Sequence, residues 1–202
     1  MPSLPVIANT HRFAVGGALP NGNPWVNVHH LRWLGAGAAT SSDLTAAEGL
    51  LRRLYYGTAY ASGAAWLTNC VAGVTYTGCT VYPLDGSSVA VVIPVTGAVG
   101  TGTGNSLHPS ICYVISLKTN HRGRSYRGRV YLPSPNVGSC NSVGDLNTSV
   151  ITNTQNQYAG MKTALAAIGF EPVVASYLLT IATPITTYVM DWRPEHQVRR
   201  KS

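Results

Sequence analysis

The chain is poor in charged residues. Only 10% of its 202 residues are Asp, Glu, Lys or Arg, whereas about a quarter are charged in a typical soluble domain. A monomer of this composition would expose mainly Gly, Ala, Thr, Ser, Asn and Tyr, which hydrate weakly and tend to associate. Because the cores of subunit interfaces are depleted in Lys, Glu and Asp, the composition predicts a chain that assembles with copies of itself. A poorly soluble monomer or a secreted adhesin would have a similar composition.

Carboxylates and catalytic motifs are scarce as well. The seven acidic residues occur singly, without a DxD or ExxE pair, which argues against a two-carboxylate glycosidase or a carboxylate-ligated metal. His29 and His30 are adjacent, so in a strand they would point to opposite faces and would not share one metal ion. HExxH and GxSxG motifs are missing. We therefore expect no catalytic residues, no metal site and no cofactor, and thus no enzyme.

Long apolar runs and targeting signals are also missing. No apolar run reaches about 18 residues, so no transmembrane helix and no membrane partner are expected. The first residues lack a basic region followed by an apolar core, the pattern of a secretory signal, and we expect synthesis in a cytoplasm. The glycine-rich segment 97–105 lacks the full GxGxxG pattern and a following lysine. It is predicted to be a flexible connector and not a nucleotide site.

The four cysteines form no CxxC pair, which argues against a zinc ribbon or a thioredoxin-like site. Four cysteines can form two disulfides or none, and the missing secretory signal favours reduced thiols. Cys70 and Cys79 fall on facing parts of a predicted hairpin and are therefore the candidate disulfide.

Turn, capping and periodicity signals predict the elements. Asn21-Gly22 is a strong turn signal, Thr45 and Glu48 have the spacing of a capping box, and Gly169 fits a helix C-cap. Segment 67–82 is predicted to be either two strands joined near Thr77-Gly78 or one long bent strand. The other predicted strands are 12–18, 25–33, 89–95, 111–117, 129–132, 172–177 and 185–192, and the predicted helices are 42–60 and 154–168.

This order of elements predicts an α+β fold, an antiparallel-rich sheet with two helices. A jelly-roll β-sandwich with helical insertions is the alternative topology. The length fits a single domain over residues 1–202, with a short basic C-terminal tail at 193–202.

The basic residues are concentrated in two segments, although the net charge is only +7. Arginine presents a planar fork that matches phosphate oxygens, glycine lets the backbone approach closely, and tyrosine offers a stacking face. Single-stranded nucleic acid is bound by this combination of basic groove and aromatic platform. A hairpin that pairs with carboxylates or carbonyls at a subunit contact is the alternative. The predicted nucleic-acid-binding residues of the central segment are Lys118, Arg122, Arg124, Tyr126, Arg127 and Arg129.

The second basic segment is the C-terminal tail, with Arg199, Arg200 and Lys201. A short basic tail after the last strand can reach phosphates without a cost to the core. A solubilising tail is the alternative interpretation.

The run RGRSYRGRVYLP at 122–133, together with NGNPWVNVHHLRW at 21–33 and a closing QVRRK, resembles a pattern in structural proteins of small viruses and phages. The resemblance implies a coat or capsid subunit that self-assembles into a virion. It also implies that the arginine segment contacts the packaged, single-stranded genome through Arg122, Arg124, Arg127 and Arg129. A phage tail, decoration or adhesin protein without nucleic-acid binding is the alternative function, whereas a stand-alone nucleic-acid-binding regulator would carry far more charge.

Overall fold

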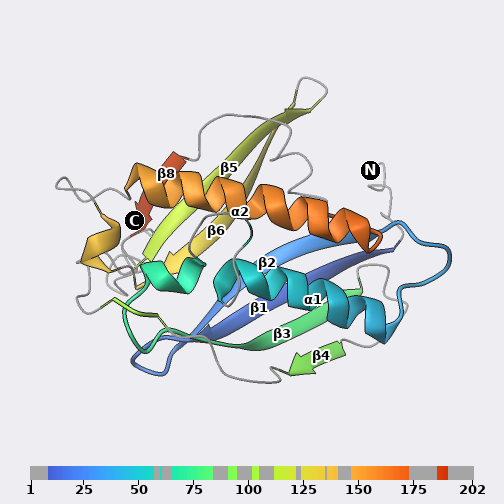
Figure 1. Ribbon diagram of the computed structural model, residues 1–202, viewed down its shortest axis with the longest axis horizontal. Coiled ribbons are helices and arrows are strands. Elements are labelled where there is room, and N and C mark those ends of the chain that lie inside the picture. The colour runs from blue at the N-terminus through green and yellow to red at the C-terminus, as the bar shows by residue number, and fades with distance from the viewer. Residues whose placement is uncertain are drawn as a thin grey trace, which may run out of the picture.

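Figure 1 shows the computed structural model of the chain, in which two helices lie against antiparallel strands. The structure describes residues 9–56, 60, 65–83, 91–94, 102–104, 112–121, 124–134, 136–140, 147–172 and 186–190. Its strands are β1 (Thr10–Ala18), β2 (Pro24–Trp33), β3 (Thr75–Pro83), β4 (Val91–Pro94), β5 (Cys112–His121), β6 (Arg124–Pro133), β7 (Phe170–Pro172) and β8 (Thr186–Met190). Its helices are α1 (Ser41–Tyr55), α2 (Thr148–Ala167) and the short 3-10 helices η1 (Trp66–Asn69) and η2 (Val137–Ser139).

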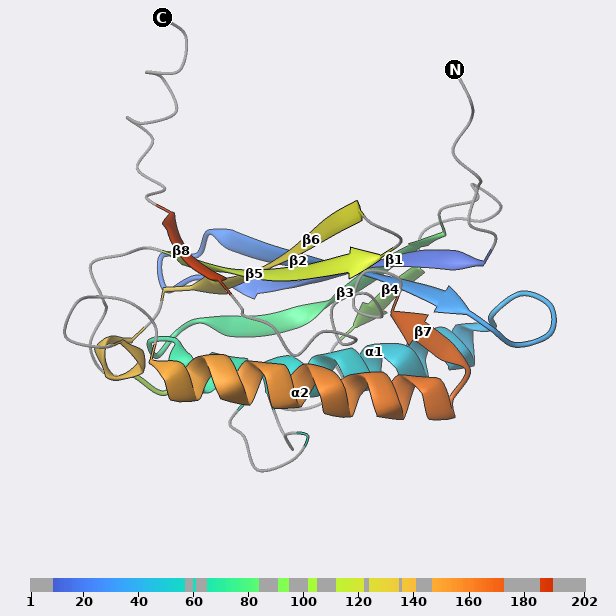
Figure 2. The ribbon, with the colours of Figure 1, turned by 90° about the horizontal axis from the view of Figure 1, so that it is seen from above.

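The strands form two antiparallel sheets. The larger has the order β4-β3-β1-β2-β7, and the smaller has the order β6-β5-β8. β6 lies beside β2, so the smaller sheet continues the larger one at its β2 edge. In the described part of the chain, both α-helices cover the same face of the larger sheet, and no helix lies on the opposite face (Figure 2). The α+β prediction is confirmed, and the jelly-roll alternative is not adopted.

The β1–β2 hairpin follows the turn signal and the alternation of the sequence. Gly22 has a φ of 83°, which favours glycine, and its N–H donates to the carbonyl of Leu19 at 2.8 Å. In β2 the buried positions are Trp25, Asn27, His29 and Leu31, while the residues between them face away from the helices. His29 and His30 therefore point to opposite faces of this strand, as expected.

α1 begins at a different cap from the one predicted. The side chain of Thr40 accepts from the N–H of Asp43, and the Asp43 carboxylate accepts from the N–H of Thr40 at 2.8 Å. This reciprocal pair is the capping box, so the prediction for Thr45 and Glu48 is wrong. Glu48 is buried instead. The helix ends at Tyr55, before the predicted 60, because Tyr56 adopts an extended backbone.

α2 begins at Thr148, six positions before the predicted start. Its core-facing side includes Tyr158, Met161 and Leu165, which are buried, and Ile168, which packs partly buried against the core. Gly169 follows the helix with a φ of 81°, as expected for the residue that ends a helix in the left-handed conformation.

Segment 67–82 differs from the predicted strands. It contains η1, a turn and then β3, so Cys70 lies at the end of η1 and Cys79 lies within β3. The two residues do not face each other across a hairpin, and Cys79 is a buried free thiol. The Cys70–Cys79 disulfide is therefore not formed.

The described part of the glycine-rich segment is tied to the body by backbone hydrogen bonds. The N–H of Gly102 donates to Val74 at 2.8 Å, and the N–H of Gly104 donates to Cys70 at 3.0 Å. A Cβ on Gly102 would lie 2.0 Å from the carbonyl oxygen of Val71, so this close approach requires glycine. Residues 102–104 are thus held in place beside the residues that follow η1. The prediction of a flexible connector is wrong for them.

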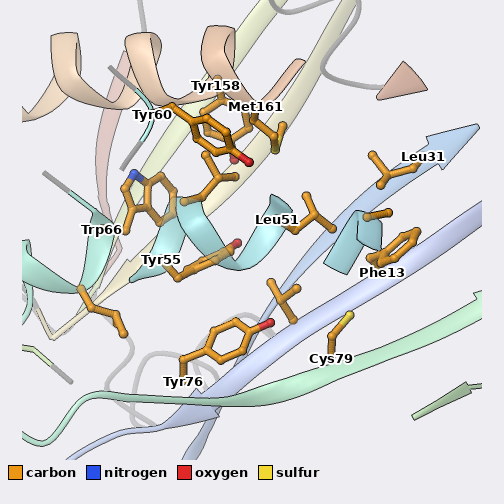
Figure 3. Close-up of a cluster of buried hydrophobic side chains, with 14 of the residues drawn as sticks. Phe13, Leu31, Leu51, Tyr55, Tyr60, Trp66, Tyr76, Cys79, Tyr158 and Met161 are labelled. Atoms are coloured by element: carbon orange, nitrogen blue, oxygen red, sulfur yellow. The ribbon is translucent and has the colours of Figure 1, made fainter. Parts of the chain in front are cut away.

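The core lies between the helices and the larger sheet and is rich in aromatic rings (Figure 3). The ring centroid of Tyr55 lies 5.5 Å from Trp25, 5.7 Å from Trp66 and 5.8 Å from Tyr76. Tyr55 therefore joins side chains of β2, η1 and β3 to α1. Within the described residues, no helix combines the length and apolarity needed to cross a bilayer.

Candidate nucleic-acid hairpin and open sheet face

The central basic segment forms the paired strands β5 and β6. The register places Lys118 opposite Arg127, Ser116 opposite Arg129 and His121 opposite Arg124. The strands therefore run through the basic motif, whereas the sequence predicted shorter strands that flank it. Strand pairing brings Lys118 next to Arg127, which is nine positions away in the sequence. Their spacing in the sequence did not show that they are neighbours.

The basic positions of the hairpin belong to both alternating sets of strand positions. Directly opposed residues share a face of an antiparallel pair, so Lys118, Arg127 and Arg129 belong to one set. Arg124 and Tyr126 belong to the other set. Figure 1 shows the hairpin rising away from β2 towards its tip. The predicted site residues Arg122, Arg199, Arg200 and Lys201 lie outside the described residues.

The acidic residues of the described part of the chain are already engaged elsewhere. Asp43 caps α1, Glu48 accepts from the hydroxyl of Tyr76 at 2.6 Å, and Glu171 pairs with Arg32 at 2.7 Å. Each of these three carboxylates is therefore engaged by a residue outside the hairpin.

The face of the larger sheet opposite the helices is open and carries few charges. Two cross-strand rows define its centre, which we call the open face: Val28–Ala14–Thr80–Val92 and Val26–Gly16–Gly78–Pro94. Val92 is 70% exposed, Val26 53% and Val28 36%. The rows contain no ionisable side chain.

The core contains a group of buried polar residues that sequence reasoning missed. Nε2 of His29 lies 2.7 Å from the hydroxyl of Tyr55, and the Tyr76 hydroxyl donates to Glu48, which is 3% exposed. Burial, together with the neighbouring Glu48, raises the pKa of both Tyr76 and the Cys79 thiol. Glu48 lies one turn from Leu44 and Leu51 on the apolar stripe of α1, and this spacing was the signal for its burial.

Burial also changes the protonation behaviour of His29 in this polar group. Burial, followed by the effect of His30, lowers the pKa of His29 to about 4, so its imidazole is neutral at neutral pH. The described residues contain no cluster of three or more His, Cys, Asp or Glu side chains arranged to hold a metal ion.

We find no known protein family, curated protein or solved structure that matches this chain.

Proposed function

We propose that the chain is a virion structural protein, a coat or capsid subunit that self-assembles and contacts the packaged nucleic acid through the β5–β6 hairpin. The observation that carries the proposal is the open face, where three exposed valines lie among small uncharged residues, on a sheet whose described helices lie on the other side. An exposed apolar surface of this kind is typical of protein–protein contacts.

The open face offers enough apolar surface to contribute to association. Complete burial of an exposed valine contributes roughly 1.5 kcal/mol or more. The exposed valines of two facing copies therefore supply a stabilisation of the order of the entropic cost of association, which is about 4 kcal/mol or more. Ala14, Gly16 and Gly78 project little from the strands, so two such sheets can approach each other closely.

The hairpin supports a nucleic-acid partner. Its basic positions lie in paired strands, and the described carboxylates are engaged elsewhere. A polyanion is the simplest source of counter-charge. The resemblance of segment 122–133 to structural proteins of small viruses and phages points in the same direction. Under this proposal the subunit assembles in the host cytoplasm and resides in the virion.

The assembly half of the proposal predicts the effect of a charge on the open face. Val92→Lys and Val26→Lys place an ammonium group where the proposal has a dry contact, and burial of an unpaired charge is costly. We expect either substitution to weaken assembly by about tenfold or more, as measured by size-exclusion chromatography with light scattering and by electron microscopy. Thr163→Lys, on the exposed side of α2, is the matched control and should assemble like the wild type.

Closed shells that contain nucleic acid support the coat proposal. Tubes or small rings without nucleic acid would instead indicate a tail or decoration protein. A stable monomer at all concentrations, or full assembly of the Val92→Lys and Val26→Lys variants, would contradict the role of the open face.

A further inference from the structure

One end of the face that carries the valines is cationic and aromatic. The register places Tyr82 of β3, Arg12 of β1 and His30 of β2 in one cross-strand row. Cζ of Arg12 lies 5.5 Å from the ring centroid of Tyr82. Both side chains are exposed, Tyr82 to 41%. We call these three residues the Arg12 row. It was not apparent from the sequence, because the three residues are far apart in the chain.

The charge of the row comes from Arg12. Arg32 is the next residue of β2 on the same face, diagonal to Arg12, but it is paired with Glu171 at 2.7 Å. Among the described residues, Glu171 forms its salt bridge with Arg32, and no carboxylate pairs with Arg12. The guanidinium of Arg12 therefore offers hydrogen-bond donors to an anion from outside the subunit.

His30 adds a neutral polar group to the row. Burial, followed by the positive charge of Arg12, lowers the pKa of the half-buried His30. At neutral pH the row thus combines one guanidinium, one neutral imidazole and one exposed aromatic ring. The guanidinium is suited to binding a phosphate group. The exposed aromatic ring is suited to a nucleobase, because every base has a face that stacks on an aromatic ring or on a guanidinium plane.

We propose that the Arg12 row is a second contact site for single-stranded nucleic acid, in which Arg12 binds a phosphate and Tyr82 stacks on a base. The inference rests on the proposed function, from which it takes nucleic acid as the class of partner. It adds a binding surface outside the β5–β6 hairpin. β2 is the strand between Arg12 and the neighbouring β6. A nucleic-acid strand bound at the hairpin therefore crosses β2 to reach the row.

The location of the row also distinguishes it from the other arginine–tyrosine pairs. Arg52 lies over Tyr56 and Arg53 over Tyr60, with 6.0 Å and 4.0 Å from Cζ to the ring centroid. Both arginines are in the last turn of α1, where a positive charge stabilises the end of a helix. Their position is explained by the helix, whereas a strand gives Arg12 no such role. Arg52 is therefore the matched control.

The test measures binding of the full chain to labelled single-stranded oligouridine and oligodeoxythymidine by fluorescence anisotropy over a range of salt concentrations. Tyr82→Leu should weaken binding about tenfold, because it removes the stacking face, and Tyr82→Phe should retain the wild-type affinity. Arg12→Gln should lower the slope of the logarithm of the binding constant against the logarithm of salt concentration by about one, as expected for one lost phosphate contact. Arg52→Gln removes the same charge and should leave affinity nearly unchanged.

Photocrosslinking with 4-thiouridine in the oligouridine gives a second readout, which should identify the peptide that contains Tyr82. Preference for either the RNA or the DNA oligonucleotide is compatible with the site and identifies the sugar it favours. The inference is overturned if Arg12→Gln and Tyr82→Leu bind like Arg52→Gln while neutralisation of the hairpin arginines weakens binding, and the proposed function then stands. Failure of the wild-type chain to bind either oligonucleotide would contradict both.

Discussion

His29 is a buried residue of the core whose lowered pKa makes stability depend on pH. Its ring contacts Tyr55 of α1 and Tyr158 of α2, with centroids 6.0 Å and 6.4 Å apart, so it lies where both helices meet the sheet. Burial lowers the pKa of His29 from 6.5 to about 4. The unfolded chain therefore takes up a proton at a higher pH than the folded chain does, and acid favours unfolding.

The His29 pKa gives the first prediction at this scale. A group with a depressed pKa contributes its full stability above the unfolded value of 6.5, and this contribution is lost as the pH falls towards 4. We expect the free energy of unfolding to fall by about 2 kcal/mol between pH 7 and pH 4.5 through this residue alone. His29→Gln should reduce the pH dependence by that amount in urea denaturation at the two pH values. An unchanged pH dependence would show that other groups control acid unfolding.

At the scale of elements, the features predicted from the sequence were those that depend on a few neighbouring residues. The Asn21-Gly22 turn and the end of α2 at Gly169 were both predicted, because each depends on backbone conformation within a few residues. The Thr40–Asp43 capping box is equally local and was missed because a competing match to the motif, Thr45 and Glu48, lay nearby.

Contacts between distant residues were not predictable. Gly160 lies within α2, although glycine costs about 1 kcal/mol relative to alanine there. A Cβ at this position would lie 2.4 Å from Cβ of Tyr60, so glycine allows the segment after α1 to pack on α2. The hairpin register and the Arg12 row depend in the same way on strand pairing. Pairing is set by the whole sheet and was not readable from one strand.

Gln157 supplies the prediction for this helix contact. Its side chain is fully buried, accepts from the N–H of Tyr60 at 2.7 Å and donates to the carbonyl of Tyr60. Gln157→Leu leaves both backbone groups without a partner, and each buried unsatisfied group costs about 1–3 kcal/mol. We expect a loss of about 3 kcal/mol in the free energy of unfolding. Asn156→Leu, at the adjacent exposed position, should change it by less than about 0.5 kcal/mol in the same denaturation experiment.

At the scale of the molecule, the two faces of the larger sheet have different compositions. The helices and the aromatic core occupy one face, and the valines and the Arg12 row occupy the other. The hairpin extends from the β2 edge (Figure 1). Under the proposed function, subunit contacts and nucleic-acid contacts can therefore change without disturbing the core, because both lie away from the helix-covered face.

This separation predicts that the hairpin arginines affect packaging more than folding. Arg124→Gln, Arg127→Gln and Arg129→Gln together should lower the nucleic-acid content of assembled particles, as measured from the ratio of absorbance at 260 and 280 nm. The salt slope of binding to single-stranded nucleic acid should fall by about two. The control variant instead removes three positive charges from the helices, at Arg52, Arg53 and Lys162. Unchanged packaging in the hairpin variant would contradict the proposed nucleic-acid contact.

The aromatic core has a practical consequence for such experiments. Trp25 and Trp66 are buried against Tyr55, and Trp33 packs on Phe170 with ring centroids 4.9 Å apart. The emission of these indoles therefore reports on the interior of one subunit, while light scattering reports on particle size. Dissociation of a shell into intact subunits and the melting of those subunits would give separate optical signals in a single sample.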